Sequence, residues 1–318
     1  MRAWLALLLL AASASFAQDK PEDTLSAVVA VSTKALDNAR SNATLGRERR
    51  GSGVLIDKGY ALTIGYLVIE AEQIEVTGAD GKTVPATLAG YDHASGFGLL
   101  KLVAPLAGKP LALGDSSAVG EREPALAASR EGANIVYVVS RRAFTGSWEY
   151  QLDSAIFTYP AVEAWSGAPL IGPKGELLGI GSLIVPDAGG PGTQSPGNMF
   201  VPIDLLKPIL ADLKASGKRK GPPRPWLGVT TDEMRGRVFV SRVSPEGPAE
   251  RAGLQRDDIV LTVAGQEVRT LAEFYGKVWA RGAAGVEVPM KVLRGVQMRD
   301  VSVRSIDRVE YFRPSKLH

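Results

Sequence analysis

Short apolar runs separated by turn residues recur through the first 185 residues, and this spacing limits the fold more than any other feature of the sequence. Many short strands at such intervals are typical of a β sandwich or barrel. Asp80-Gly81 is a hairpin-turn signal between two of the runs. The runs cover residues 26–34, 53–56, 60–63, 73–77, 83–90, 97–103, 124–128, 134–140 and 176–185. We therefore expect a mainly β first half.

A helix is predicted to close this half. Asp204 is the expected N-cap and Gly217 follows the helix end. The apolar stripe consists of Leu205, Leu206, Ile209, Leu210 and Leu213. Residues 38–50 are polar, end in an Arg-Glu-Arg-Arg run and are interpreted as a solvated loop rather than a binding patch.

The length of 318 residues suggests about two domains at roughly 150 residues each. A stiff basic Pro-rich linker separates the first half from a smaller second half that mixes strands with helices. The predicted boundaries are 24–216 for the first domain, 217–225 for the linker, 226–307 for the second domain and 308–318 for a tail.

The N-terminus has the pattern of a secretory signal peptide. Arg2 precedes an apolar run over residues 4–12, and Ser15 and Ala17 suit a small-x-small cleavage site. The run is shorter than the 20 or so apolar residues that span a bilayer. The sequence therefore predicts a signal peptide over residues 1–17, no membrane span, and a periplasmic or otherwise secreted mature chain.

Composition excludes several kinds of site. The chain has no cysteine and two histidines, His93 and His318, so thiolate centres and multi-histidine zinc sites are ruled out by counting. Neither a metal nor a cofactor is expected. The net charge is +3 and the basic residues are scattered, which argues against a nucleic-acid partner.

Four segments of the first half, 51–57, 59–63, 90–102 and 166–180, resemble the HtrA (DegP-like) family of trypsin-like serine proteases, in the family's order. The resemblance implies a trypsin-like double β-barrel. It places the nucleophile at Ser166, but the catalytic His position holds Tyr66 and the catalytic Asp position holds Gly96. A phenol with a pKa near 10 is a poor general base at pH 7, and glycine has no side chain to orient one.

The oxyanion loop also departs from the family's Gly-Asn-Ser-Gly-Gly. Ala164 stands where the family has a glycine, and Trp165 replaces a small amide. A Cβ penalises the positive φ that glycine allows. His93 belongs to another segment and is not expected to serve as a base. The sequence thus predicts that Ser166 is an inert serine in a retained turn.

The second half resembles the PDZ domain that follows HtrA proteases, so we expect an α+β fold. Its signatures are residues 226–229, 244–254, 257–260 and 263–268. The resemblance implies a loop that holds a peptide carboxylate, next to a strand and a helix that flank a groove. The predicted peptide-binding residues are Trp226, Leu227, Gly228, Val229, Thr230, Leu271, Phe274 and Val278, of which the three helical ones share a face that divides between pocket and core.

These patterns favour an exported, non-catalytic protein that binds peptides or unfolded segments in envelope quality control, as adaptor, regulator or holdase. Three alternatives stay open. The chain could be an active endopeptidase with a rearranged site at Ser166, a scaffold that modulates active relatives, or a PDZ module with a structural role alone. Peptides or unfolded C-termini are the expected partners, with a homo-oligomer or HtrA-type relatives as further candidates.

Overall fold

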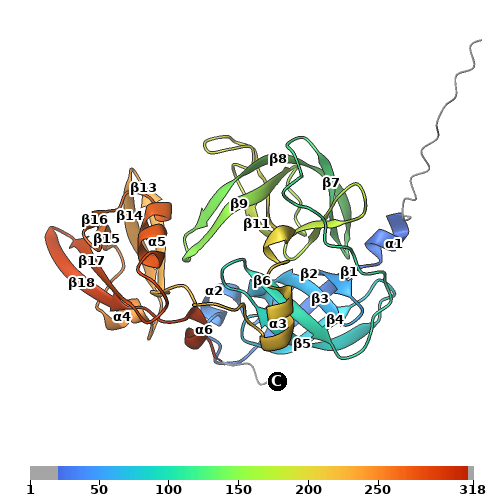
Figure 1. Ribbon diagram of the computed structural model, residues 1–318, viewed down its shortest axis with the longest axis horizontal. Helices are drawn as coiled ribbons and strands as arrows, with labels where there is room; N and C mark the ends of the chain where they lie inside the picture. Colours follow the sequence, from blue (N-terminus) through green and yellow to red (C-terminus); the bar gives the residue numbers. More distant parts are fainter. Residues whose placement is uncertain (1–20, 314–318) are drawn as a thin grey trace, which may run out of the picture.

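Two β-barrels and a smaller β-rich unit make up the molecule (Figure 1). The structure is a computed structural model and describes residues 21–313. The predicted signal peptide over residues 1–17 lies outside the described residues. A short helix, α1 (Pro21–Leu25), precedes the first strand.

The first barrel closes in the order β1-β2-β3-β6-β5-β4, with antiparallel neighbours. Its strands alternate buried and exposed residues where one face meets solvent, as β4 does. The strands are β1 (Val28–Ala35), β2 (Glu48–Asp57), β3 (Tyr60–Ile64), β4 (Ala71–Thr77), β5 (Thr83–Tyr91) and β6 (Phe97–Leu102). Helix α2 (Asn42–Leu45) and a 3₁₀ turn, η1 (Gly65–Leu67), lie in its connections.

The second barrel closes in the order β10-β11-β12-β9-β8-β7. Its longest strands, β8 and β9, form a hairpin that extends toward the third unit (Figure 1). The strands are β7 (Pro124–Ser129), β8 (Gly132–Gly146), β9 (Tyr150–Tyr159), β10 (Pro169–Ile171), β11 (Leu177–Val185) and β12 (Gly197–Pro202). One apolar core contains residues of both barrels, so the two pack as a single body.

The third unit has its own apolar core and a sheet in the order β13-β14-β15-β17-β18, with β16 paired to β15. Strand β13 therefore lies at one edge of this sheet. The strands are β13 (Val229–Met234), β14 (Arg237–Val243), β15 (Ile259–Val263), β16 (Gln266–Glu267), β17 (Glu287–Arg294) and β18 (Gln297–Arg304), with helices α4 (Pro248–Arg251) and α5 (Leu271–Trp279). The prediction of a mainly β double barrel followed by an α+β unit is confirmed.

The helix that closes the barrels begins later than predicted. Residues 203–205 form a 3₁₀ turn, η2 (Ile203–Leu205), and the α-helix α3 spans Leu210–Ser216. Asp204 is not its N-cap, because its carboxylate accepts hydrogen bonds from Ser116 Oγ and the Ser117 N–H instead. Gly217 ends the helix in the left-handed conformation, as expected.

The prediction of a solvated loop before β2 is wrong for its last residues, because β2 begins at Glu48 and Arg49 is buried. Arg49 Nη1 donates to the carbonyl oxygens of Tyr66 (3.0 Å) and Ile69 (2.8 Å). A guanidinium is tolerated at such a position because its donors are satisfied. Its effect is to fix the segment that carries Tyr66.

Part of the predicted tail is folded. Helix α6 (Arg308–Tyr311) lies between the third unit and the first barrel (Figure 1). The Tyr311 ring packs on Trp226 with centroids 4.7 Å apart, and the Arg40 guanidinium lies over the Tyr311 ring, 4.3 Å from its centroid. The Arg313 N–H donates to Glu70 of the first barrel. The end of the chain thus connects the third unit to the barrels.

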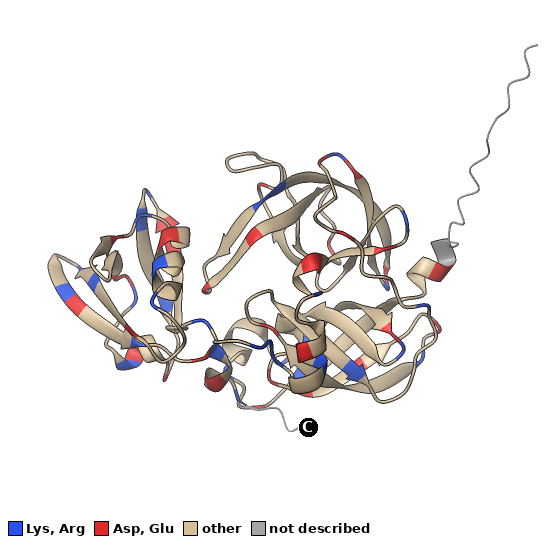
Figure 2. Ribbon diagram, viewed as in Figure 1, with Lys and Arg blue, Asp and Glu red and all other residues tan. Residues whose placement is uncertain are grey.

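Positive and negative residues are interspersed over all three units (Figure 2). Within residues 21–313, no helix is long and apolar enough to cross a membrane.

Candidate active site and peptide groove

Ser166 lies in a turn between the two barrels. Its carbonyl oxygen accepts from the Ser52 N–H of the first barrel at 2.8 Å. The next residue, Gly167, has φ +72° and would place a Cβ 2.1 Å from the Ser52 carbonyl oxygen. Only glycine fits there, so the Ser-Gly pair preserves the turn whether or not the serine reacts.

The structure brings Tyr66 and Ser166 together. The Tyr66 hydroxyl donates its one proton to the Ser182 carbonyl oxygen at 3.0 Å, and its oxygen lies within hydrogen-bond distance of Ser166 Oγ, at 2.9 Å. A general base must take the serine proton during the reaction, whereas a neutral phenol is a very weak base. Burial raises the pKa of Tyr66 further above its ordinary value. The pair is therefore a neutral hydrogen bond.

Gly96, at the position that the sequence analysis assigned to the catalytic Asp, has neighbours from the second barrel. Gly96 has φ +86°, and a Cβ there would lie 3.4 Å from the Tyr150 hydroxyl and 3.6 Å from Ile64 Cδ1. The Tyr150 hydroxyl donates to the Ser95 carbonyl oxygen at 2.7 Å. A tyrosine from the second barrel thus stands beside the place where a carboxylate would orient the base.

Asp92, the acid nearest along the chain, is engaged elsewhere. Its two carboxylate oxygens accept from Arg219 at 2.6 Å each, and Ser95 donates to it as well. Burial opposes ionisation, but these donors hold the pKa of Asp92 below its ordinary value. The carboxylate is therefore committed to an ion pair with the segment between α3 and β13.

The loop before Ser166 differs from Gly167 in backbone conformation and carries a large ring. Ala164 does not adopt a positive φ, in contrast to Gly167. The Trp165 carbonyl oxygen accepts from the Ala168 N–H at 3.1 Å, and the Trp165 ring meets Tyr66 edge-on with centroids 6.3 Å apart. The loop therefore packs an indole against the phenol where the family has a small amide.

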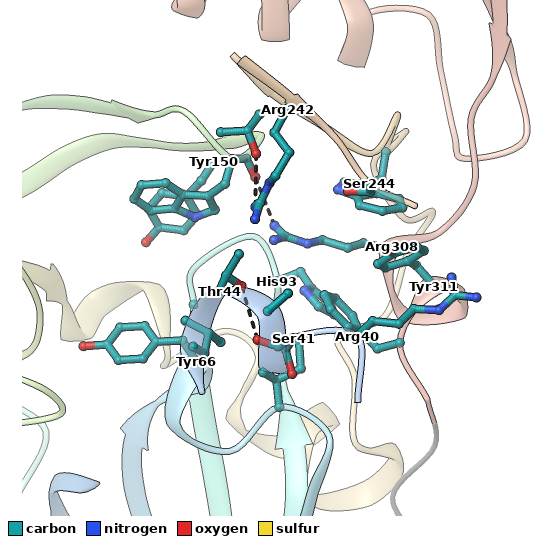
Figure 3. Close-up of a pocket in the computed structure, with 18 of the residues that line it drawn as sticks. Arg40, Ser41, Thr44, Tyr66, His93, Tyr150, Arg242, Ser244, Arg308 and Tyr311 are labelled. Atoms are coloured by element: carbon teal, nitrogen blue, oxygen red, sulfur yellow. Dashed lines mark hydrogen bonds between the residues drawn. The ribbon is translucent and has the colours of Figure 1, made fainter. Parts of the chain in front are cut away.

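His93 packs among aromatic rings away from Ser166. Its ring lies 4.2 Å from that of Tyr91 and stacks on Phe312 at 5.7 Å. Burial and Arg308 lower its pKa well below the ordinary value. Figure 3 shows it beside Arg308, apart from Tyr66. Among residues 21–313 there is no hydrogen bond between His93 and Ser166.

The predicted carboxylate-binding loop holds a carboxylate, and that carboxylate belongs to the same chain. Glu149 Oε2 accepts from the Leu227 N–H at 2.8 Å, and Oε1 accepts from the N–H groups of Gly228 at 2.8 Å and Val229 at 3.0 Å. Gly228 has φ +81°, which aims successive N–H groups the same way. Burial raises the pKa of Glu149 to about 7, while these donors and Arg308 oppose the rise.

The adjoining sheet edge is also occupied. The Ser147 carbonyl oxygen accepts from the Thr231 N–H of β13 at 2.8 Å and from the Tyr275 hydroxyl of α5 at 2.8 Å. Arg308 donates to the Trp148 carbonyl oxygen at 3.3 Å. Residues 147–149, which connect β8 to β9, therefore contact the loop, the strand and the helix that the sequence analysis assigned to a peptide groove.

The other predicted groove residues divide between surface and core. Phe274 and Val278 are each 1% exposed and belong to the apolar core, and Leu271 packs partly against it. Tyr275 is the helix residue that reaches the groove. Its hydroxyl is hydrogen-bonded to Thr231 and Ser147. The sequence analysis did not assign Tyr275 to the groove, because it lies beside the apolar stripe of the helix.

A cavity of about 920 Å³ lies between the barrels and the third unit. Tyr66 and Trp165 line it from the barrels, and Val229 and Thr230 line it from β13. Figure 3 shows Arg242 and Arg308 near its middle, between the tyrosines of the barrels and Tyr311. The surroundings of Ser166 and the start of β13 therefore face one space.

Within the described part of the chain, no group of three or more His, Asp or Glu residues is placed to hold a metal ion.

Comparison with known proteins agrees with these two units. The trypsin-like peptidase domain family matches residues 51–180, and the PDZ domain family matches residues 225–304. Solved structures of the HtrA-type protease AlgW have the same fold. The complex with a tripeptide has a TM-score of 0.52 at 24% identity, covering 92% of this chain and 96% of that one. The complex with a decapeptide has a TM-score of 0.53 at 23% identity, covering 92% and 97%.

Curated relatives include a probable periplasmic serine protease do/HhoA-like from Haemophilus influenzae, 30% identical over 277 residues that cover 80% of this chain and 57% of the relative. The periplasmic pH-dependent serine endoprotease DegQ of Escherichia coli is 28% identical over 279 residues, covering 80% and 59%. The chain thus spans little more than half the length of these relatives. With both domains matched in order, the chain belongs to the HtrA/DegP-like family of trypsin-like peptidases that carry a PDZ domain.

Proposed function

We propose that this protein is a pseudoprotease that recognises the free C-termini of peptides or unfolded proteins through its PDZ domain without cleaving them. One observation carries the proposal: the loop at residues 227–229 already binds a carboxylate with three backbone N–H groups. Charge-assisted bonds of this kind are the strong ones. A peptide C-terminus presents the same group.

The barrels support a role without proteolysis. A phenol, Tyr66, lies beside Ser166, Gly96 offers no carboxylate, and Ala164 stands where the family has the glycine of the oxyanion loop. Removing one oxyanion donor costs about 10²- to 10³-fold in serine proteases, and the missing base adds to that loss. The barrels would then serve as a platform that holds the PDZ domain.

The names of the relatives support a location of the proposed activity in the cell envelope. Several are named periplasmic proteases, and the signal-peptide pattern of residues 1–17 points to the same compartment. A periplasmic protein that binds exposed C-termini would act in protein quality control, as an adaptor or regulator. Oligomerisation, with itself or with active relatives, is compatible with this role.

The proposal predicts that binding depends on the terminal charge. A peptide with an apolar last residue and a free carboxylate should bind the mature chain with micromolar affinity, about 8 kcal/mol. Its C-terminal amide lacks the charge that the loop recognises and should bind at least about tenfold more weakly, since bonds to charged groups contribute roughly 1.5–3 kcal/mol. Calorimetric titration measures both. Equal affinities would refute carboxylate recognition.

A further inference from the structure

The loop that connects β8 to β9 makes the contacts of a bound ligand. It supplies a carboxylate to the N–H groups of residues 227–229 and a backbone carbonyl to the Thr231 N–H of the sheet edge. These are the two elements of peptide capture by strand addition at a PDZ-type groove, one for the terminal charge and one for the backbone. Glu149 is 7% exposed, so its carboxylate is withdrawn from solvent into this contact.

Glu149 is an unfavourable residue for the turn that it occupies. Gly146 pairs with Tyr150, and three residues close the hairpin. Glu149 has φ +58°, a left-handed conformation that three-residue hairpin loops commonly give to glycine. A non-glycine residue is strained in this conformation. The turn at Glu149 is therefore locally unfavourable, and the hydrogen bonds from its carboxylate to residues 227–229 offset this strain.

The hairpin is also fixed from its other side. The Trp148 ring stacks on Tyr150 with centroids 5.6 Å apart, and Arg308 of α6 donates to the Trp148 carbonyl oxygen. The Tyr275 hydroxyl bridges Thr231 and Ser147. Contacts from the second barrel, α5 and α6 thus converge on three consecutive residues.

We propose that residues 147–149 are an internal ligand that closes the peptide groove, so that an external C-terminus binds only by displacing Glu149 from the loop at residues 227–229. This inference rests on the proposed peptide-binding function and names its regulation. An internal ligand competes at a high effective concentration, because the chain tethers it to its site. The apparent affinity for an external peptide is then the intrinsic affinity multiplied by the fraction of molecules in which Glu149 has left the loop.

Displacement would have a consequence at the barrels. The N–H groups of Val229 and Thr231 would donate to the peptide instead of to Glu149 and Ser147. The link between the β8–β9 hairpin and the PDZ domain would then break. Other links to the first barrel include Arg40, which contacts the Tyr311 ring and pairs with Glu246, and the Arg313 N–H, which donates to Glu70. We expect the filled PDZ domain to stay attached along this side and to separate from the hairpin on the other. The expected ligand is a polypeptide with an unmodified C-terminus. Such a chain offers a carboxylate to the N–H groups of residues 227–229 and, from a preceding residue, a backbone carbonyl to the Thr231 N–H.

The test uses the full mature chain and removes the internal carboxylate in two ways. Glu149→Gly removes the side chain and suits the left-handed turn, so it should not weaken the fold. Glu149→Gln keeps the shape but turns an amide donor toward N–H donors. Glu131→Gln is the matched control, because Glu131 is an exposed glutamate in the neighbouring β7–β8 turn. Each protein is titrated with a free-acid peptide ending in an apolar residue, and amide hydrogen exchange is followed over residues 226–232.

Both Glu149 variants should bind the peptide at least tenfold more tightly than wild type, with faster exchange over residues 226–232 in the absence of peptide, and Glu131→Gln should match wild type. Unchanged affinity and exchange in both variants would overturn the inference while leaving peptide binding by wild type intact. Faster exchange without binding by any variant would overturn the proposed function, and this inference with it.

Discussion

Restoring the two missing triad residues, with Tyr66→His and Gly96→Asp together, is expected to leave the protein at least about 10³-fold less active on unfolded casein than an active HtrA protease. Aspartate at position 96 must adopt φ +86° beside the Tyr150 hydroxyl, a strained conformation that costs about 1–3 kcal/mol. The restored pair would also face an oxyanion loop in which Ala164 and Trp165 are unchanged. Donors in that loop act on the transition state, so base and orienter alone cannot replace them.

Activity should emerge only when Ala164→Gly and a small amide at position 165 are added to the two reversions. Ser166→Ala in the same background is the control for contaminating protease. Casein turnover is read by release of labelled fragments. If the two-residue revertant approaches the turnover of an active relative, the assigned role of the oxyanion loop is wrong.

The second large effect is expected at the carboxylate loop. Gly228→Val should lower the affinity for a free-acid peptide by about 30-fold or more, because two or three charge-assisted hydrogen bonds depend on the backbone at this residue. Gly228 has φ +81°, and a Cβ there would lie 3.1 Å from the Trp226 ring, 3.3 Å from Pro248 and 3.4 Å from Ser244. A β-branched side chain in that space forces the N–H groups out of line.

Gly253→Val separates this effect from a general loss of stability. Gly253 has the same φ of +81° in the same domain, with nothing within 4 Å of its would-be Cβ. Both substitutions strain the backbone, but only Gly228→Val disturbs the loop. The titrations are made in the Glu149→Gly protein, in which the groove is expected to be free. An equal loss of affinity in the two variants would show that the effect comes from backbone strain and not from carboxylate recognition.

The sequence predicted the parts of the fold that depend on local patterns. Alternating apolar runs fixed the strands of the first barrel, and Asp80-Gly81 marks the hairpin turn between β4 and β5, with Gly81 at φ +79°. Where a residue's partner is remote, local patterns failed. Asp204 is a residue type that often caps helices. Its carboxylate instead accepts hydrogen bonds from Ser116 and Ser117, almost ninety residues earlier in the chain.

The same limit applies to the sites. Motif order was enough to bring Tyr66 and Ser166 together, because the family resemblance carries long-range information that composition lacks. Nothing in the sequence signalled that Glu149 would meet the loop at residues 227–229, since a glutamate after a tryptophan in a turn is an ordinary solvated residue. The buried Arg49 was misjudged for a similar reason: its acceptors are backbone carbonyls of another segment.

The central claim is that the barrels catalyse no proteolysis and that Ser166 is chemically inert. Labelling of the mature chain with an organophosphorus probe for serine hydrolases, read by intact mass, tests this most directly, since the probe reacts with an activated serine and not with an ordinary one. The account predicts no adduct on wild type and an identical spectrum for Ser166→Ala. A stoichiometric adduct that disappears in Ser166→Ala would contradict it.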